Sequence, residues 1–186
     1  MKKVKLLTLL TLCFIVTQCS YAQESTKVKI KRAMSAAPSS ISADATIMDN
    51  DGTILRKGSN GWTCLPNVLS GDMKPICNDA TWMEMLAALG KKEHFETDRI
   101  GISYMLVGDI GAGVSNSTPY HEDHKNAEDY VETGPHLMII VPKEQLTGLT
   151  RDPKKGGPYV MWGDTPYAHI MIPIDESKVL MKNHKQ

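Results

Sequence analysis

Two cysteines constrain the fold of this chain more than any other feature of its sequence. Of four cysteines, Cys13 and Cys19 lie in the first 22 residues, which leaves Cys64 and Cys77 with twelve residues between them. The intervening segment, residues 65–76, is rich in Pro, Asn, Gly, Ser and Asp and is costly to order. In an oxidising compartment two such cysteines pair, so the sequence predicts a disulfide that closes this loop. The pair is not CxxC and has no histidine close by, which disfavours a redox or nucleophilic cysteine.

The N-terminal sequence predicts the cellular compartment of the protein. A lysine-rich head, an apolar stretch over residues 6–16 and small residues ending at Ala22 form the three parts of a secretion signal. That stretch is shorter than the roughly 20 residues of a membrane-spanning helix, and no later segment is long enough. We therefore predict cleavage between Ala22 and Gln23, and a periplasmic or secreted protein without a membrane span. The alternative is lipid modification of Cys19, which the bulky Gln18 before it disfavours.

Removal of the signal changes the charge and sets the domain boundaries. The signal holds three of the 21 basic residues and no acid, so 18 basic residues face 21 acidic ones, a formal charge of −3. No role in nucleic-acid binding follows from this balance. Residues 23–40 are polar, with a basic cluster, and are expected to form a flexible lead-in rather than an anchor to an anionic surface. Residues 41–182 are expected to fold as one globular domain.

Local patterns predict the first elements of that domain. Residues 49–52 form an Asp-Gly turn between two short strands, which is typical of a hairpin. The same DNDG sequence lacks the alternating ligands of a calcium loop, because Ile47 occupies one of those positions. Asn78 or Asp79 can cap a helix whose apolar residues recur at a spacing of three and four as far as Gly90.

The remaining strands fall later in the chain. Residues 100–107 form a buried apolar run, and residues 136–141, 159–162 and 167–172 form three more, the last two joined by a Gly/Pro turn. The predicted fold is therefore α+β: a mostly antiparallel sheet with one principal helix in a single disulfide-stapled domain.

Two of these strands carry a repeated His-x-Met pattern. Side chains alternate along a strand, so His136 and Met138 share one face of the first strand, as His169 and Met171 share one face of the last. We expect the aliphatic faces to pack on the helix that contains Trp82, with both His-x-Met pairs on the opposite face. Imidazole and thioether suit cuprous copper, so these four residues are a candidate copper site. The alternative is that the methionines fill core gaps and the histidines hydrogen-bond a covering loop.

Four motifs stand out in combination: GWTCLP around Cys64, C-x-D-x-x-W from Cys77 to Trp82, GPHLMIIVP, and GGPYVMWGDTPYAHIMIPI. Together they resemble a family of uncharacterised bacterial exported proteins, a domain of unknown function. The resemblance spans roughly residues 38–174. It implies one exported domain, and it supplies no activity, cofactor or catalytic residue.

A second cluster of metal-ligating residues lies in the long segment of residues 108–134, whose length is typical of a functional or mobile loop. His121-Glu-Asp-His124 falls one residue short of the H-E-x-x-H pattern, because Lys125 stands where the second histidine is needed. A zinc hydrolase is therefore not predicted. A looser metal site and a plain solvated acidic loop both stay open.

Four aromatic residues suggest a binding function. Their positions at Gly/Pro-rich strand ends suit a groove for a small molecule or a protein partner, although aromatic residues also cover cores. These candidates are Trp62, Tyr159, Trp162 and Tyr167. The sequence accordingly favours an exported, non-catalytic binding or accessory protein whose ligand is unknown.

Two other functions stay open beside it. One is copper binding through the His-x-Met strands. The other is a hydrolase-type enzyme with a site near the last hairpin, for which strand ends offer four acid-base candidates: Asp109, Asp164, Tyr167 and His169. The sequence contains no Gly-x-Ser-x-Gly elbow, phosphate loop or dinucleotide fingerprint.

Overall fold

A computed structural model describes residues 24–69, 71–174 and 180–181. The strands of its large sheet are β1 (Thr46–Met48), β2 (Ile54–Arg56), β3 (Thr63–Leu65), β4 (Ile76–Asn78), β5 (Gly101–Met105), β8 (His136–Ile140), β9 (Tyr159–Met161) and β10 (His169–Pro173). Those of a small sheet are β6 (Val114–Ser115), β7 (Tyr130–Glu132) and β11 (Leu180–Met181). The α-helices are α1 (Thr26–Met34), α2 (Ser39–Ser42) and α3 (Ala80–Lys91), and the 3-10 helices are η1 (His124–Asn126), η2 (Lys143–Leu146) and η3 (Pro153–Lys155).

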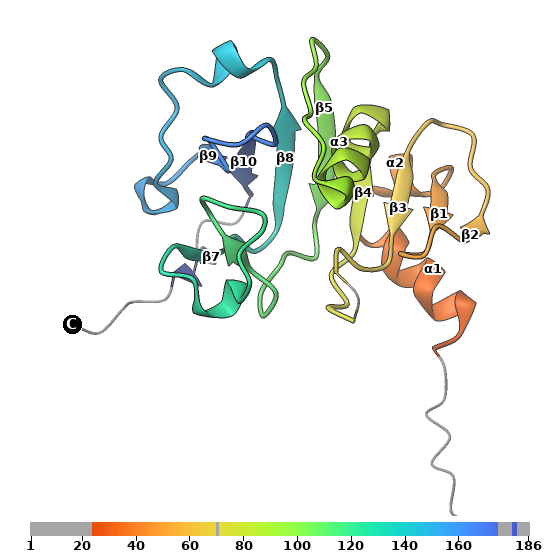
Figure 1. Ribbon diagram of the computed structural model, residues 1–186. Coiled ribbons are helices and arrows are strands. Elements are labelled where there is room, and N and C mark those ends of the chain that lie inside the picture. The colour runs from red at the N-terminus through yellow and green to blue at the C-terminus, as the bar shows by residue number, and fades with distance from the viewer. Residues whose placement is uncertain (1–23, 70, 175–179, 182–186) are drawn as a thin grey trace, which may run out of the picture.

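The large sheet has eight strands in the order β2-β1-β3-β4-β5-β8-β10-β9 (Figure 1). Only β1 and β3 pair in parallel, and every other neighbouring pair is antiparallel. The predicted α+β class is therefore confirmed. So are the β1–β2 and β9–β10 hairpins, which place Ile47 opposite Arg56 and Met161 opposite His169.

The predicted disulfide is present and lies in the sheet itself. Cys64 on β3 and Cys77 on β4 are directly opposite each other across an antiparallel pair, and both are fully buried. The bridge thus closes the loop between two neighbouring strands, as the spacing of the cysteines predicts.

The two faces of the sheet are covered by different helices. Side chains alternate along β4, so Cys77 joins an alanine-rich cluster with Ala33 of α1, whereas Asn78 contacts Met83 of α3 on the opposite face. The larger core lies on the α3 face and extends along β5, β8, β10 and β9. Figure 1 shows α3 in front of the sheet.

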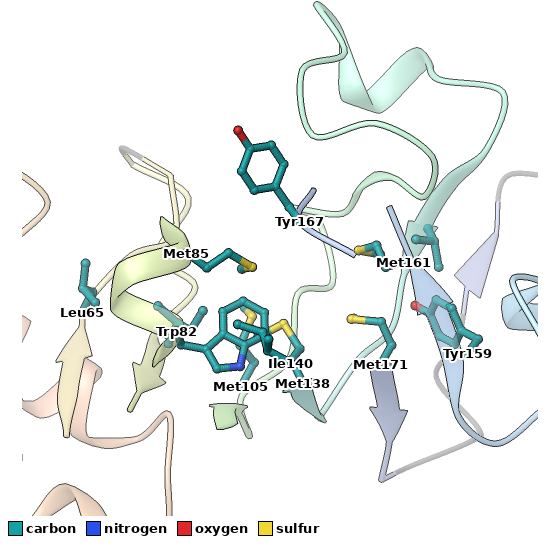
Figure 2. Packing of buried hydrophobic residues seen from close by; sticks show 12 residues of the cluster. Leu65, Trp82, Met85, Met105, Met138, Ile140, Tyr159, Met161, Tyr167 and Met171 are labelled. Atoms are coloured by element: carbon teal, nitrogen blue, oxygen red, sulfur yellow. The ribbon is translucent and has the colours of Figure 1, made fainter. Parts of the chain in front are cut away.

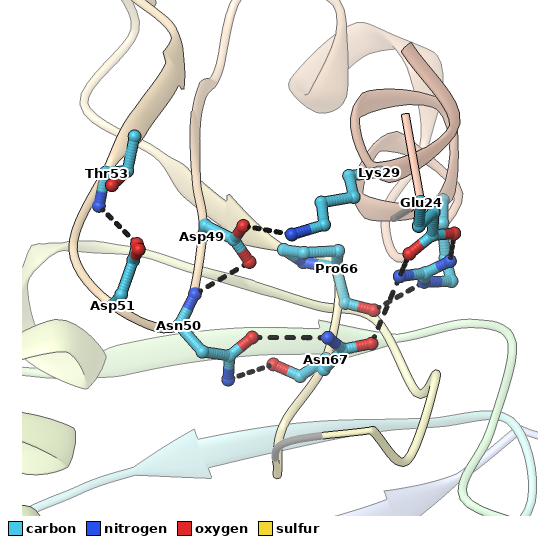
Figure 3. Close-up of polar contacts among 9 residues, drawn as sticks. Glu24, Lys29, Asp49, Asn50, Asp51, Thr53, Pro66 and Asn67 are labelled. Atoms are coloured by element: carbon cyan, nitrogen blue, oxygen red, sulfur yellow. Dashed lines mark hydrogen bonds and ion pairs between the residues drawn. The ribbon is translucent and has the colours of Figure 1, made fainter. Parts of the chain in front are cut away.

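The expected flexible lead-in is wrong for residues 26–37. They form α1 and the turn after it, because Ala33 and Ala36 are completely buried and α1 docks on the sheet through small side chains. Polar contacts fix its other side (Figure 3): Lys29 Nζ lies 2.5 Å from Asp49 Oδ2, and Arg32 pairs with Glu24 and donates to the carbonyl oxygen of Pro66 at 2.9 Å. The basic cluster that suggested a solvated tether supplies these contacts.

Asp79 determines where α3 begins and also ties the helix to the sheet. One carboxylate oxygen accepts from the backbone N–H of Trp82 at 2.9 Å, and the other from that of Ile102 at 2.7 Å. The cap predicted at Asn78 or Asp79 is thus Asp79. The helix continues through Gly90, where we expected it to stop, and ends at Lys91. Lys92 caps it in a left-handed conformation.

We expect Asp79→Ala to reduce the free energy of unfolding by about 2 kcal/mol, the sum of a lost cap and an unpaired strand N–H. Asp79→Asn keeps one acceptor and should lose about half as much. Urea unfolding followed by circular dichroism measures both. Equal stability of Asp79→Ala and the parent chain would contradict the double role of this side chain.

The long segment between β5 and β8 is ordered around a second, three-stranded sheet with the order β11-β7-β6. The two ends of the segment meet where Gly108 (φ +78°) lies against the backbone of Gly134. A Cβ on Gly108 would lie 2.5 Å from the carbonyl carbon of Gly134, so only glycine fits this crossing. The crossing positions the next residue, Asp109.

None of the helices in the described part of the chain combines the length and apolarity needed to cross a bilayer.

Candidate functional site

The His-x-Met faces of β8 and β10 lie beneath α3, contrary to the expectation that the aliphatic faces would pack there. His136, Met138, His169 and Met171 are 1–6% exposed, whereas the residues between them are only partly buried. The alternation was right and the choice of face was wrong. Flexible methionines can fill the irregular space around the Trp82 indole, where stiff β-branched side chains pack less readily.

The strand register separates the two histidines. Met138 lies directly opposite Met171, His136 lies opposite Pro173, and His169 lies opposite Met161 of β9. The two histidines therefore lie on either side of the methionine pair. They are four residues apart along the strand direction, a separation of about 13 Å.

A cavity of about 90 Å³ lies between α3 and this face of the sheet. Both histidines border it, as do Trp82 and Trp162. Its sulfur-bearing walls come from several strands: Met105, Met138, Met161 and Met171. Figure 2 shows the thioether ends of Met161 and Met171 turned toward the side of the core where Trp82 lies.

His169 is held as a neutral imidazole with one ring nitrogen unpaired. Nδ1 donates to the carbonyl oxygen of Tyr167 at 2.9 Å, so Nε2 carries the lone pair. This Nε2 is buried and has no hydrogen-bond partner among the described residues. Burial lowers the pKa of His169 to about 4. The imidazole is therefore an unprotonated base at neutral pH.

Two tryptophans border this imidazole. The ring centroids of Trp82 and Trp162 each lie 5.1 Å from that of His169, in edge-to-face arrangements. Trp162 adopts a left-handed backbone (φ 54°), which is costly for a bulky residue, and its Nε1 donates to the carbonyl oxygen of Ser115 at 3.0 Å. Trp82 Nε1 is buried and, within the described ranges, has no partner.

His136 lies at the other end of the cavity beside a buried carboxyl group. Its Nδ1 donates to the carbonyl oxygen of Gly134 at 2.6 Å. Asp109 Oδ1 accepts from the backbone N–H groups of Thr133 and Gly134, both at 2.8 Å. Burial raises the pKa of Asp109 and lowers the pKa of His136, and the attraction between the two partly opposes both shifts.

The four predicted aromatic residues lie in different places. Trp62 packs on Tyr104, at 5.5 Å between ring centroids, in the cluster on the α1 face. Tyr159 and Tyr167 are buried in the larger core, where the Tyr159 hydroxyl bonds Thr133 and the Tyr167 hydroxyl donates to the carbonyl oxygen of Glu93. Trp162 is the member of the set that borders the cavity.

The four acid-base candidates are likewise spread out. Asp109 and His169 border the cavity, while Tyr167 does not. Asp164 is exposed and pairs with Arg151 at 2.7 Å, beside an open surface groove of about 800 Å³.

The histidines of residues 108–134, His121 and His124, are not part of a set of metal ligands among the described residues. The rings of His121 and His124 lie 6.0 Å apart, and His124 Nδ1 accepts from the backbone N–H of Ser115 at 3.1 Å. In the part of the chain that the structure describes, no group of three or more His, Cys, Asp or Glu residues could hold a metal ion.

Among the cavity-wall residues that reasoning from the sequence missed are Met161 and the unpaired indole of Trp82. Met161 had a usable signal, because pairing the strands about the Gly163–Pro166 turn brings it opposite His169. The environment of the Trp82 indole has no signal in the sequence.

Comparisons with models of protein families, with curated proteins and with solved structures give no match for this chain. The resemblance to exported bacterial proteins therefore stays a prediction, and the function has to be argued from the site.

Proposed function

We propose that the chain is an exported, non-catalytic binding protein, and that a small ligand occupies the cavity beneath α3. The observation that supports this most is the pair of unpaired groups in its wall, an acceptor at Nε2 of His169 and a donor at Nε1 of Trp82. Leaving a buried polar group unpaired costs about 1–3 kcal/mol. A ligand that bonds either group offsets that cost.

The size and lining of the cavity favour a small ligand. Its volume of about 90 Å³ equals that of about three water molecules. Indole and thioether groups make the wall mostly apolar, and the few polar groups in it would fix the orientation of a ligand. An enzyme site has less support, because Asp164 and Tyr167 lie outside this cavity.

Export is supported by two features. The predicted signal, residues 1–22, lies outside the described residues and rests on its sequence pattern. The Cys64–Cys77 disulfide is compatible with an oxidising compartment.

Pyrrole and furan test the cavity as a ligand site. Both are five-membered rings of similar shape, but pyrrole alone carries an N–H that can donate to His169 Nε2. We expect pyrrole to bind about fivefold more tightly than furan, the effect of one hydrogen bond. Titrations followed by NMR of the Trp82 indole N–H and the methionine methyl groups, on protein recovered from cells expressing the full chain, measure both affinities.

The His169→Leu variant is the control, because it keeps an apolar wall and removes the acceptor. It should bind the two rings equally. If neither ring shifts the signals of the cavity in the parent protein, the cavity does not admit ligands and the proposal is wrong.

A further inference from the structure

The surroundings of His169 define what kind of ligand the cavity can take. Its Nε2 lone pair is buried and unpaired, and Nδ1 is fixed by the carbonyl oxygen of Tyr167. Histidines that ligate metals commonly donate their other ring N–H to a backbone carbonyl in this way, which fixes the tautomer and the ring. No proton has to leave Nε2 before it binds a metal ion.

Two thioethers lie beside this lone pair. Met161 is the direct cross-strand neighbour of His169, and Met171 follows it by two positions on the same face. Residues opposite each other on one face have Cβ atoms about 4.5–5.5 Å apart, within reach of a long methionine side chain. Both methionines and His169 border the same cavity.

This donor set is soft and uncharged. One imidazole nitrogen and two thioether sulfurs suit Cu(I), whereas calcium and magnesium need oxygen ligands, and zinc favours thiolate, imidazole and carboxylate. The described residues contain no group of three or more His, Cys, Asp or Glu that would compete as a hard or borderline site.

Two tryptophan rings lie beside the imidazole that would bind the ion. The ring centroids of Trp82 and Trp162 each lie 5.1 Å from that of His169, and tryptophan attracts a cation placed over its ring within about 6 Å.

We propose that the ligand of the cavity is one cuprous ion, bound by Nε2 of His169 and the thioether sulfurs of Met161 and Met171. This inference rests on the proposed function. It replaces the four-residue set expected from the sequence, because His136 and His169 are about 13 Å apart along the strand direction. The ion passes from its carrier to the protein as Cu(I), and its oxidation state does not change.

An anaerobic titration with Cu(I), with bicinchoninate as the competing chelator, tests the proposal on protein recovered from cells expressing the full chain. We expect one Cu(I) per chain and quenching of tryptophan fluorescence. His169→Leu should weaken binding by about a hundredfold or more, and Met161→Leu and Met171→Leu by about tenfold each, because every one removes a direct ligand.

Met85→Leu is the matched control, since Met85 is fully buried in the same core and is not part of the cavity wall. Methionine-to-leucine changes conserve volume and keep the fold. Copper bound as tightly by His169→Leu as by the parent protein, or lost equally in Met85→Leu, would overturn the assignment.

Pyrrole binding to the same samples separates this inference from the proposed function. Cu(I) should displace pyrrole, because both use His169 Nε2. If the parent protein binds pyrrole and takes up no Cu(I), the copper assignment is wrong and the ligand cavity stands. If it binds neither, both proposals are wrong.

Discussion

Lowering the pH from 7 to 4 should remove about 3 kcal/mol from the free energy of unfolding through His169 alone. Burial lowers the pKa of His169 from 6.5 to about 4 in the folded chain. A group whose pKa is depressed on folding binds protons more readily when unfolded, so its contribution is complete above pH 6.5 and is lost as the pH falls toward 4. The lowered pKa of His136 acts in the same direction.

Asp109 opposes this trend in part. Burial raises its pKa, so below neutral pH the folded chain takes up this proton more readily than the unfolded chain does. The contribution of His169 is therefore best measured as a difference between two proteins. Urea unfolding at a series of pH values should show His169→Leu losing about 3 kcal/mol less than the parent chain between pH 7 and pH 4.

An NMR titration of the His169 Cε1–H signal should give a midpoint near pH 4. Parallel stability curves for His169→Leu and the parent chain would show that this imidazole titrates alike in both states.

Replacing both disulfide cysteines with alanine should cost about 3 kcal/mol, the loop-closure entropy that the bridge removes from the unfolded chain. Cys64 and Cys77 already face each other across a hydrogen-bonded strand pair, so the folded sheet needs little change when the bridge is lost. The loss of stability should therefore come from the greater conformational entropy of the unfolded chain. Chemical denaturation of the double variant and the parent chain measures it.

Two further readings make the disulfide prediction specific. The NMR signals of His169 and Trp82 should be unchanged, because the bridge lies on the face of the sheet opposite α3. Reduction of the parent chain should reproduce the stability of the double variant. A loss below about 0.5 kcal/mol would mean that the loop is already restricted in the unfolded chain.

Several local features could be predicted because they depend on neighbouring residues alone. The Asp-Gly turn of the first hairpin and the cap at Asp79 follow from backbone preferences and short hydrogen bonds. The disulfide follows from two cysteines in a predicted oxidising compartment. The long segment between β5 and β8 gave no such signal, because the strands of its small sheet are only two or three residues long.

Part of the candidate site could also be predicted. The twofold alternation of a strand put His136 with Met138, and His169 with Met171, and the structure keeps both pairs on one face of the sheet. Alternation gives no information about which face another element covers. That depends on where α3 docks, and α3 lies over the histidine and methionine face.

The sequence by itself determined where α3 and the strands β1, β2, β5, β8, β9 and β10 lie, which cysteines pair, and which residues of a strand share a face. The tertiary structure decided that α1 packs against the sheet and does not form a flexible tether. It also decided that His169 is buried between two indoles with Nε2 unpaired, and that Met161 is the cross-strand neighbour of His169. The reason is physical: turns, caps and alternation act over a few residues, whereas burial depends on contacts between segments far apart in the chain.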